Sequence, residues 1–199
     1  MNTAIPMNQC ALFGSGEQTL LDDSTGVVAY LPGFITPDRA QTWFDELSAQ
    51  IAWQTGRRMM YDREVDVPRL RAHFRVADAP LPPALSDALE LVRKHVKAPF
   101  DSVGLNLYRD QHDSVAPHND RTGDLVKGQP IALLSLGASR TMVIRQKKAP
   151  FLQLHIELEA GSLLTMSWDT QLYYDRGVPK QREKVGPRIS VAFRVRTTI

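Results

Sequence analysis

The first half of the chain carries the hydrophobic spacing of two amphipathic helices. Apolar residues at positions 40, 43, 44 and 47 follow Thr36 and Pro37, and their i, i+3, i+4, i+7 order predicts one buried helix face. Thr36 suits the N-cap and Pro37 the first helical position, so we expect this helix to run to about Gln50. Apolar positions 85, 88, 89 and 92 follow a Pro-Pro pair and predict a second helix.

The second half of the chain changes to short runs with the alternation of β-strands. Turn residues separate these runs after Pro99, and eight short strands are typical of a jelly roll. The predicted strands are 103–108, 114–118, 131–136, 141–145, 152–158, 162–166, 171–174 and 189–195. A further short strand is predicted at 27–31, and we expect strand and loop in the Arg-rich stretch 53–74.

These elements predict a single, mainly β (α+β) domain. We expect an irregular N-terminal arm at 1–25 and one domain at 26–199, with helices in 26–100 and a jelly-roll core, a double-stranded β-helix, in 101–199. The chain has 199 residues, of which 43% are hydrophobic. That is enough to bury a core without disulfides or a structural metal.

Composition limits the setting and the partners of the protein. A net charge of +2 and a pI near 8.8 are compatible with a nucleic-acid partner. Cys10 is the only cysteine, which excludes an internal disulfide and favours a reducing cytoplasm. The N-terminus lacks the pattern of a signal peptide, and no apolar run reaches the roughly 18 residues that cross a membrane. We expect a cytoplasmic protein without membrane contact, and nothing requires more than a monomer.

His118 and Asp120 stand two residues apart at the end of a predicted strand. Alternate side chains of a strand share a face, so both can point into one cavity. An imidazole and a carboxylate placed in this way are two of the three ligands of a non-haem Fe(II) site. A His-x-Asp pair is also common on protein surfaces, and that alternative remains open at this point.

Arg188 and Arg194 lie six residues apart on the last predicted strand and therefore share one of its faces. Apolar residues at 189, 191, 193 and 195 occupy the opposite face. A buried guanidinium is costly unless it meets a carboxylate, and its fork suits the bidentate capture of one end of a dicarboxylate. A solvated strand face with two arginines is the alternative interpretation.

Together these residues and their order resemble the AlkB-type 2-oxoglutarate- and Fe(II)-dependent dioxygenases. The resemblance extends over about residues 26–196 and rests on segments that follow one another in the family's order. The segments are 30–34 (YLPGF), 67–70 (VPRL), 106–110 (NLYRD), 113–120 (DSVAPHND), 135–140 (SLGASR), 161–166 (GSLLTM), 177–180 (GVPK) and 186–194 (GPRISVAFR).

The resemblance implies Fe(II), 2-oxoglutarate and O2 as cofactor and co-substrates. It implies that Asn106 and Tyr108 hydrogen-bond 2-oxoglutarate and that Arg188 pairs with its distal carboxylate. Arg194 would lie over the cofactor at the reactive centre, which makes it both a cofactor-binding and a candidate catalytic residue.

The resemblance also implies that His118 and Asp120 bind the iron, together with a His immediately before the segment 177–180. Arg176 stands at that position, and a guanidinium has no lone pair with which to bind a metal. Three outcomes are open: Asp175 supplies the third ligand through a bend in the chain, iron binds weakly to two ligands, or the metal is lost and Arg176 pairs with Asp120 or with the acid. Weakened or absent metal binding is preferred over replacement by Asp175.

Residues 57–71 correspond by resemblance to a nucleotide-recognition lid that closes on a flipped base. The candidate substrate-binding residues are Met60, Tyr61 and Arg69, because an extruded base needs an apolar or aromatic contact and its phosphates need cations. Acidic residues at 62, 64 and 66 offset the arginines of this stretch, and an ordinary solvated hairpin is the alternative.

The implied function is oxidative dealkylation of alkylated bases in DNA or RNA, with DNA as the first choice of partner. One alternative is a degenerate jelly roll that acts as a binding module, which Arg176 favours. Another is an oxygenase that acts on a protein or a small molecule, which the modest net charge leaves open.

Overall fold

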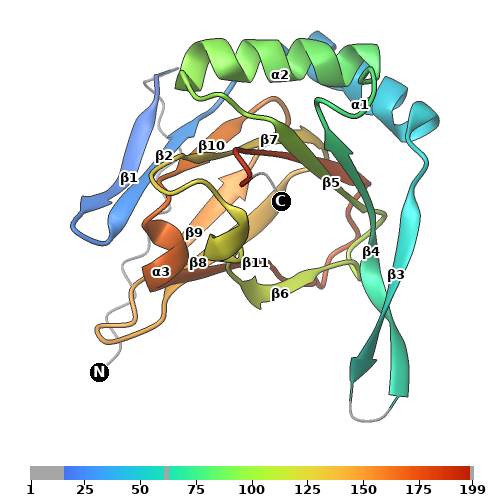
Figure 1. Ribbon diagram of the computed structural model, residues 1–199. Helices are drawn as coiled ribbons and strands as arrows, with labels where there is room; N and C mark the ends of the chain where they lie inside the picture. The colour runs from blue at the N-terminus through green and yellow to red at the C-terminus, as the bar shows by residue number, and fades with distance from the viewer. Residues whose placement is uncertain (1–15, 61–62, 198–199) are drawn as a thin grey trace.

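Two antiparallel sheets enclose the interior of the computed structural model, which describes residues 16–60 and 63–197 (Figure 1). The strands are β1 (Gln18–Asp23), β2 (Gly26–Leu31), β3 (Gln54–Met60), β4 (Arg63–Arg75), β5 (Ser102–Tyr108), β6 (Val115–His118), β7 (Ile131–Gly137), β8 (Arg140–Gln146), β9 (Gln153–Leu158), β10 (Leu163–Met166), β11 (Tyr174–Val178) and β12 (Arg188–Arg194). The major sheet has the order β1-β2-β10-β7-β12-β5-β4-β3, and the minor sheet has the order β6-β11-β8-β9. The expected mainly β fold, a jelly-roll core with flanking N-terminal helices, is confirmed.

The helices α1 (Pro37–Gln50) and α2 (Pro83–Val96) cover the outer face of the major sheet (Figure 1). Thr36 caps α1, since its Oγ1 accepts a hydrogen bond from the backbone N of Arg39 at 3.4 Å. The apolar faces of both helices pack against the sheet in a first hydrophobic core. Both predicted helices are confirmed. Among the described residues, no helix is long and apolar enough to span a membrane.

A second hydrophobic core lies between the two sheets, and β12 separates it from the first. Ile189, Val191 and Phe193 belong to the core under the helices, whereas Ala192 belongs to the core between the sheets. Because strand side chains alternate, Arg188, Ser190 and Arg194 share the face of Ala192. The predicted alternation is confirmed, and the polar positions of β12 line the interior of the barrel.

The β3–β4 hairpin stands beside the open edge between the sheets. It forms one edge of the major sheet, and β6 forms an edge of the minor sheet (Figure 1). The C-terminal half of β4 pairs with β5, and the backbone N of Ser114 donates to the carbonyl of Pro68 at 2.8 Å. The hairpin that was expected to serve as a lid is therefore tied to the segment that leads into β6.

Two local expectations were wrong. Gln18–Asp23 lie in the part expected to be irregular but form β1 through backbone pairing with β2, although most of their side chains are exposed. The segment 171–174 was expected to be a strand, but Thr170–Tyr173 form the short helix α3 and β11 begins at Tyr174. Backbone hydrogen bonds from Gln171 to Trp168 and from Thr170 to Ser167 close this turn.

Candidate functional site

A row of polar side chains crosses the inner face of the major sheet. Strands β5 and β12 pair so that Tyr108 lies opposite Arg188 and Asn106 lies opposite Ser190. Strand β4 adds Arg69, whose Nε donates to Oδ1 of Asn106 at 2.8 Å. The sheet register thus brings the predicted cofactor-binding residues from distant parts of the sequence to one surface.

Arg188 is fully buried, with 0% of its surface exposed. Its Nη2 donates to Oγ of Ser135 at 2.9 Å, and its guanidinium carbon lies 5.4 Å from the centre of the Tyr108 ring. The Nε and Nη1 atoms have no hydrogen-bond partner within the described part of the chain. Burial lowers the pKa of Arg188 and raises the pKa of Tyr108. A buried cation with two unused donors is the feature expected of an anion-binding residue.

Arg140 lies on the same aromatic ring but has a structural role. Its guanidinium carbon is 5.5 Å from the centre of the Tyr108 ring. Its Nη atoms donate to three backbone carbonyls, those of Asp110, Asp113 and Pro179, at 2.7 to 3.1 Å. Sequence reasoning assigned no role to Arg140, because only the fold shows that these three loops meet around it.

Asp120 is held by two arginines, Arg176 of β11 in the minor sheet and Arg194 of β12 in the major sheet. Its Oδ2 lies 2.7 Å from Nη2 of Arg176 and 2.7 Å from Nε of Arg194. The side chains of Arg176 and Arg194 are 5% and 13% exposed, and that of Asp120 is 16% exposed. Burial would raise the pKa of Asp120, but Arg176 and then Arg194 outweigh it and hold the pKa far below the ordinary carboxyl value.

Gln171 completes this cluster, and sequence reasoning missed it. Its Oε1 accepts from Nη1 of Arg176 at 2.5 Å and from the backbone N of Asp120 at 3.1 Å. Its side chain is buried, and its Nε2 donates to Oγ1 of Thr170 at 2.9 Å. The sequence signal was hidden because 171–174 was expected to be a strand, whereas the helical turn of α3 aims Gln171 at the cluster.

His118 lies at the mouth of the interior, on the edge strand β6. It pairs directly with Arg176 of β11, and its Nδ1 lies 3.0 Å from the carbonyl oxygen of Ala116. His118 is an exposed residue, yet partial burial, followed by the nearby Arg176 charge, lowers the pKa of His118. His118 is therefore a neutral imidazole near neutral pH.

These residues do not fit an Fe(II) ion held by three protein ligands. Within residues 16–60 and 63–197, no three His, Cys, Asp or Glu side chains form a metal-binding group. Asp175 does not replace the missing ligand, because it points away from Arg176 along β11 and its Oδ1 lies 3.9 Å from Nζ of Lys147. The protonated guanidinium of Arg176 pairs with the Asp120 carboxylate and would repel a metal ion bound to that carboxylate. The proposed loss of the third ligand at Arg176 is consistent with this geometry.

The same interior does fit 2-oxoglutarate. Arg188 has two buried donors without partners, and a dicarboxylate supplies the acceptor atoms that they lack. Tyr108 and Asn106 lie beside Arg188 and Ser190 on the neighbouring strand. The residues that would hold the acid are therefore present, although the expected metal ligand set is not.

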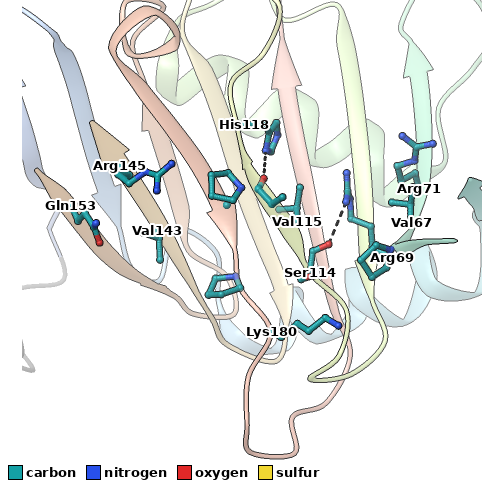
Figure 2. Close-up of a pocket in the computed structure, with 15 residues that line it drawn as sticks. Val67, Arg69, Arg71, Ser114, Val115, His118, Val143, Arg145, Gln153 and Lys180 are labelled. Atoms are coloured by element: carbon teal, nitrogen blue, oxygen red, sulfur yellow. Dashed lines mark hydrogen bonds between the residues drawn. The ribbon is translucent and has the colours of Figure 1, made fainter. Parts of the chain in front are cut away.

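A groove of about 590 Å³ runs along the open edge between the sheets, from the hairpin across β6 to the outer side of β8 and β9 (Figure 2). His118 lines it together with Arg69, Arg71, Arg145 and Lys180. No Asp or Glu lines it among the described residues. Of the candidate substrate-binding residues, Arg69 lies in the groove, whereas Tyr61 and the Met60 side chain fall outside the described residues.

The sequence of the chain is similar to that of known dioxygenases. The model of the 2OG-Fe(II) oxygenase superfamily matches residues 27–194. The alpha-ketoglutarate-dependent dioxygenase alkB homolog 3 of Homo sapiens is 30% identical over 191 residues, covering 85% of this chain and 67% of its own length. The DNA oxidative demethylase ALKBH2 of Homo sapiens is 30% identical over 175 residues, covering 76% of this chain and 66% of its own length.

Solved structures show the same fold at low sequence identity. A prolyl-4-hydroxylase of Pseudomonas putida has a TM-score of 0.55 at 14% identity, covering 85% of this chain and 93% of its own. OsALKBH1 has a TM-score of 0.52 at 16% identity, covering 84% of this chain and 97% of its own. By sequence and by jelly-roll fold, the chain belongs to the 2OG-Fe(II) oxygenase superfamily, the 2-oxoglutarate-dependent dioxygenases that use Fe(II), 2-oxoglutarate and O2.

Proposed function

We propose that this protein acts on alkylated bases in nucleic acid, DNA ahead of RNA, as an AlkB-type dealkylase whose oxidation step is weakened by Arg176. The names of relatives such as ALKBH2, a DNA oxidative demethylase, support this substrate class. The observation that carries the proposal is the basic groove between β4 and β6, which His118 lines.

The groove has the charge that a nucleic-acid strand requires. Arg69, Arg71, Arg145 and Lys180 supply four cations along its length, and phosphate contacts position a strand without reading its sequence. Arg69 also bonds Asn106 and the carbonyl of Ser114, which links the groove to the cofactor face. A base that leaves the stack at His118 would therefore reach the interior beside the residues proposed to hold 2-oxoglutarate.

Within the interior, the residues of this chain would hold the acid and keep it dry. Arg188, Tyr108 and Asn106 would bind 2-oxoglutarate, which in this family is oxidised together with the substrate. The ion pair between Arg176 and Asp120 opposes the family's metal site, and for this reason we expect the oxidation to be weak.

The experiment is binding to single-stranded DNA with and without alkylated bases, across a salt series. We expect tighter binding to the alkylated strand at every salt concentration, with affinity falling as salt rises because phosphate contacts release counterions. Equal affinity for both strands at every salt concentration would overturn the proposed substrate class.

A binding protein without oxidation is the second candidate, and the 2.7 Å contact between Arg176 and Asp120 favours it. The two candidates differ in the release of succinate from 2-oxoglutarate with saturating Fe(II). Slow release supports the weakened dealkylase, whereas an alkylated-strand preference without any release supports the binding protein.

We further propose that the protein works as a cytoplasmic monomer. No feature of the sequence calls for a second subunit, and the single Cys10 favours a reducing compartment. Analytical ultracentrifugation checks the first part, since a dimer at micromolar concentration would contradict it.

A further inference from the structure

We propose that the interior of this protein binds a short dicarboxylate, of the size of 2-oxoglutarate, without a metal ion, and that the Arg176 guanidinium supplies the positive charge that Fe(II) supplies in the family. The inference rests on the proposed function, which already places 2-oxoglutarate inside the barrel, and it adds that the acid binds there without a metal ion.

The charge balance of the interior calls for an anion. Four arginine side chains surround Tyr108 and Asp120, and none is more than 13% exposed. They are Arg140, Arg176, Arg188 and Arg194. Among the described residues, Asp120 is the one carboxylate that hydrogen-bonds to any of them. Buried cations without counter-charges cost several kcal/mol each by order of magnitude, and an enclosed dianion removes most of that cost.

One end of the proposed site is Arg188. Its Nη2 is used by Ser135, while Nε and Nη1 remain without partners in the described chain. The bidentate edges of a guanidinium are Nε with Nη2 and Nη1 with Nη2, so either of the two open donors can join Nη2 in meeting the two oxygens of a carboxylate. Since Ser135 lies opposite Ser190, the Arg188 side chain extends along β12 to about the level of Ser190.

The other end is the cluster of Asp120, Arg176 and Arg194. Two cations and one carboxylate leave one positive charge there. The Arg194 side chain extends back along β12, because its Nη1 lies 3.4 Å from the carbonyl of Ala192 and 3.2 Å from where a Cβ on Gly104 would stand. The Arg194 side chain therefore extends toward Arg188, in space that is open because Gly104 has no side chain.

The spacing between the two ends suits a short dicarboxylate. The levels of Ser190 and Ala192 are two residues apart, which is roughly 7 Å along a strand. Ser190 is buried on the same face as both arginines. A four- or five-carbon diacid reaches both cations across this gap, whereas a monocarboxylate reaches only one.

The experiment is calorimetric titration of the full chain in excess EDTA with 2-oxoglutarate, glutarate and pyruvate. We expect 2-oxoglutarate and glutarate to bind and pyruvate to bind at least about tenfold more weakly, since it meets only one of the two cationic ends. Absence of diacid binding in EDTA, or binding that appears only when Fe(II) or Mn(II) is added, would overturn the proposal.

Two variants place the anion. Arg188→Met should lower diacid affinity by about 10- to 100-fold, because the variant loses a charge-assisted pair with the acid. It should not lower the melting temperature of the free protein, because the substitution removes a buried charge that has no counter-charge. Arg182→Met, at an exposed arginine, is the matched control and leaves affinity unchanged. Equal affinities of the Arg188→Met and Arg182→Met variants would contradict the placement.

Arg176→His tests whether the guanidinium replaces the metal. We expect diacid binding to the Arg176→His variant to weaken in EDTA and to recover when Mn(II) is added in excess over EDTA. The affinity of the original chain for the diacid should not change with Mn(II). A metal response that is the same in both proteins would overturn the role of Arg176. The outcome is separate from the preference for alkylated strands, so failure of either proposal leaves a distinct result.

Discussion

Nη2 of Arg176 lies 2.7 Å from Oδ2 of Asp120, so the carboxylate expected to bind iron is engaged by a cation from its own chain. Arg194 contacts the same oxygen at 2.7 Å. This relationship turns a metal-binding position into an internal ion pair, and it makes the stability of the protein depend on Asp120.

Asp120→Asn should destabilise the protein by about 3 kcal/mol, because it leaves two largely buried guanidinium groups without a counter-charge. Urea unfolding measures the loss. The matched control is Asp175→Asn, whose 3.9 Å contact with Lys147 is partly exposed and should contribute less than about 1 kcal/mol. Equal losses in the two variants would show that the Asp120 cluster does not stabilise the fold.

The lowered pKa of Asp120 should make stability sensitive to acid. A carboxyl whose pKa is depressed in the folded state stabilises the protein above its ordinary value of 3.8, and this contribution is lost as the pH falls toward the folded value. Urea midpoints between about pH 6 and about pH 3 should therefore fall more steeply for the original chain than for Asp120→Asn. Parallel curves would contradict the depressed pKa.

Arg176→His should create a metal site. The imidazole would join His118 and Asp120 and remove the repelling charge, so we expect the affinity for Fe(II) or Mn(II) to rise by more than about tenfold, or about 1.4 kcal/mol. Anaerobic calorimetry measures it. Asp175→His is the matched control, because its side chain points to the other face of β11. An unchanged affinity in Arg176→His would remove residue 176 from the metal position.

Lys180→Gln should weaken nucleic-acid binding evenly across sequences. Lys180 lines the groove, and the loss of one phosphate contact should lower the slope of log affinity against log salt by about 0.7 for a single strand. The exposed Lys184 lies outside the groove residues, so Lys184→Gln should keep the slope. Identical slopes in both variants would exclude Lys180 from the interface.

Gly177→Ala should displace β6 and the His118 that it carries. A Cβ at Gly177 would stand 2.8 Å from the carbonyl oxygen of Val115, so the edge strand must move, at a cost of about 1–3 kcal/mol. Thermal unfolding measures the cost. Gly186→Ala is the control, since its nearest contact would be an ordinary 3.7 Å. A Gly177 variant as stable as the control would contradict the close packing of β6 on β11.

The sequence predicted the elements whose signals are periodic. The helix faces and the alternation of β12 depend on local spacing, and Thr36 marks a helix start by its own chemistry. It did not predict β1, whose pairing with β2 supplies backbone hydrogen bonds that side-chain patterns do not record. Long-range pairing overrides weak local preference at such edges.

Most members of the site were predicted from the sequence, but Gln171 and the contacts between the members were not. The resemblance indicated Asp120, Arg188 and Arg194. The departure at Arg176 was visible because an arginine cannot bind a metal in place of a histidine. The orientations of the Arg188, Arg194 and Gln171 side chains depend on where three distant strands and a helical turn meet. Those relationships are absent from the linear pattern.

Strand β12 belongs to two environments at once, and this has a consequence for how such a chain can diverge. Its side chains toward the helices hold the hydrophobic core together, while its side chains toward the barrel carry the arginines. Substitutions of these arginines therefore leave the hydrophobic packing under the helices intact. During divergence, the barrel-facing side chains of β12 can change and alter what the site binds, while the helix-facing side chains keep the fold.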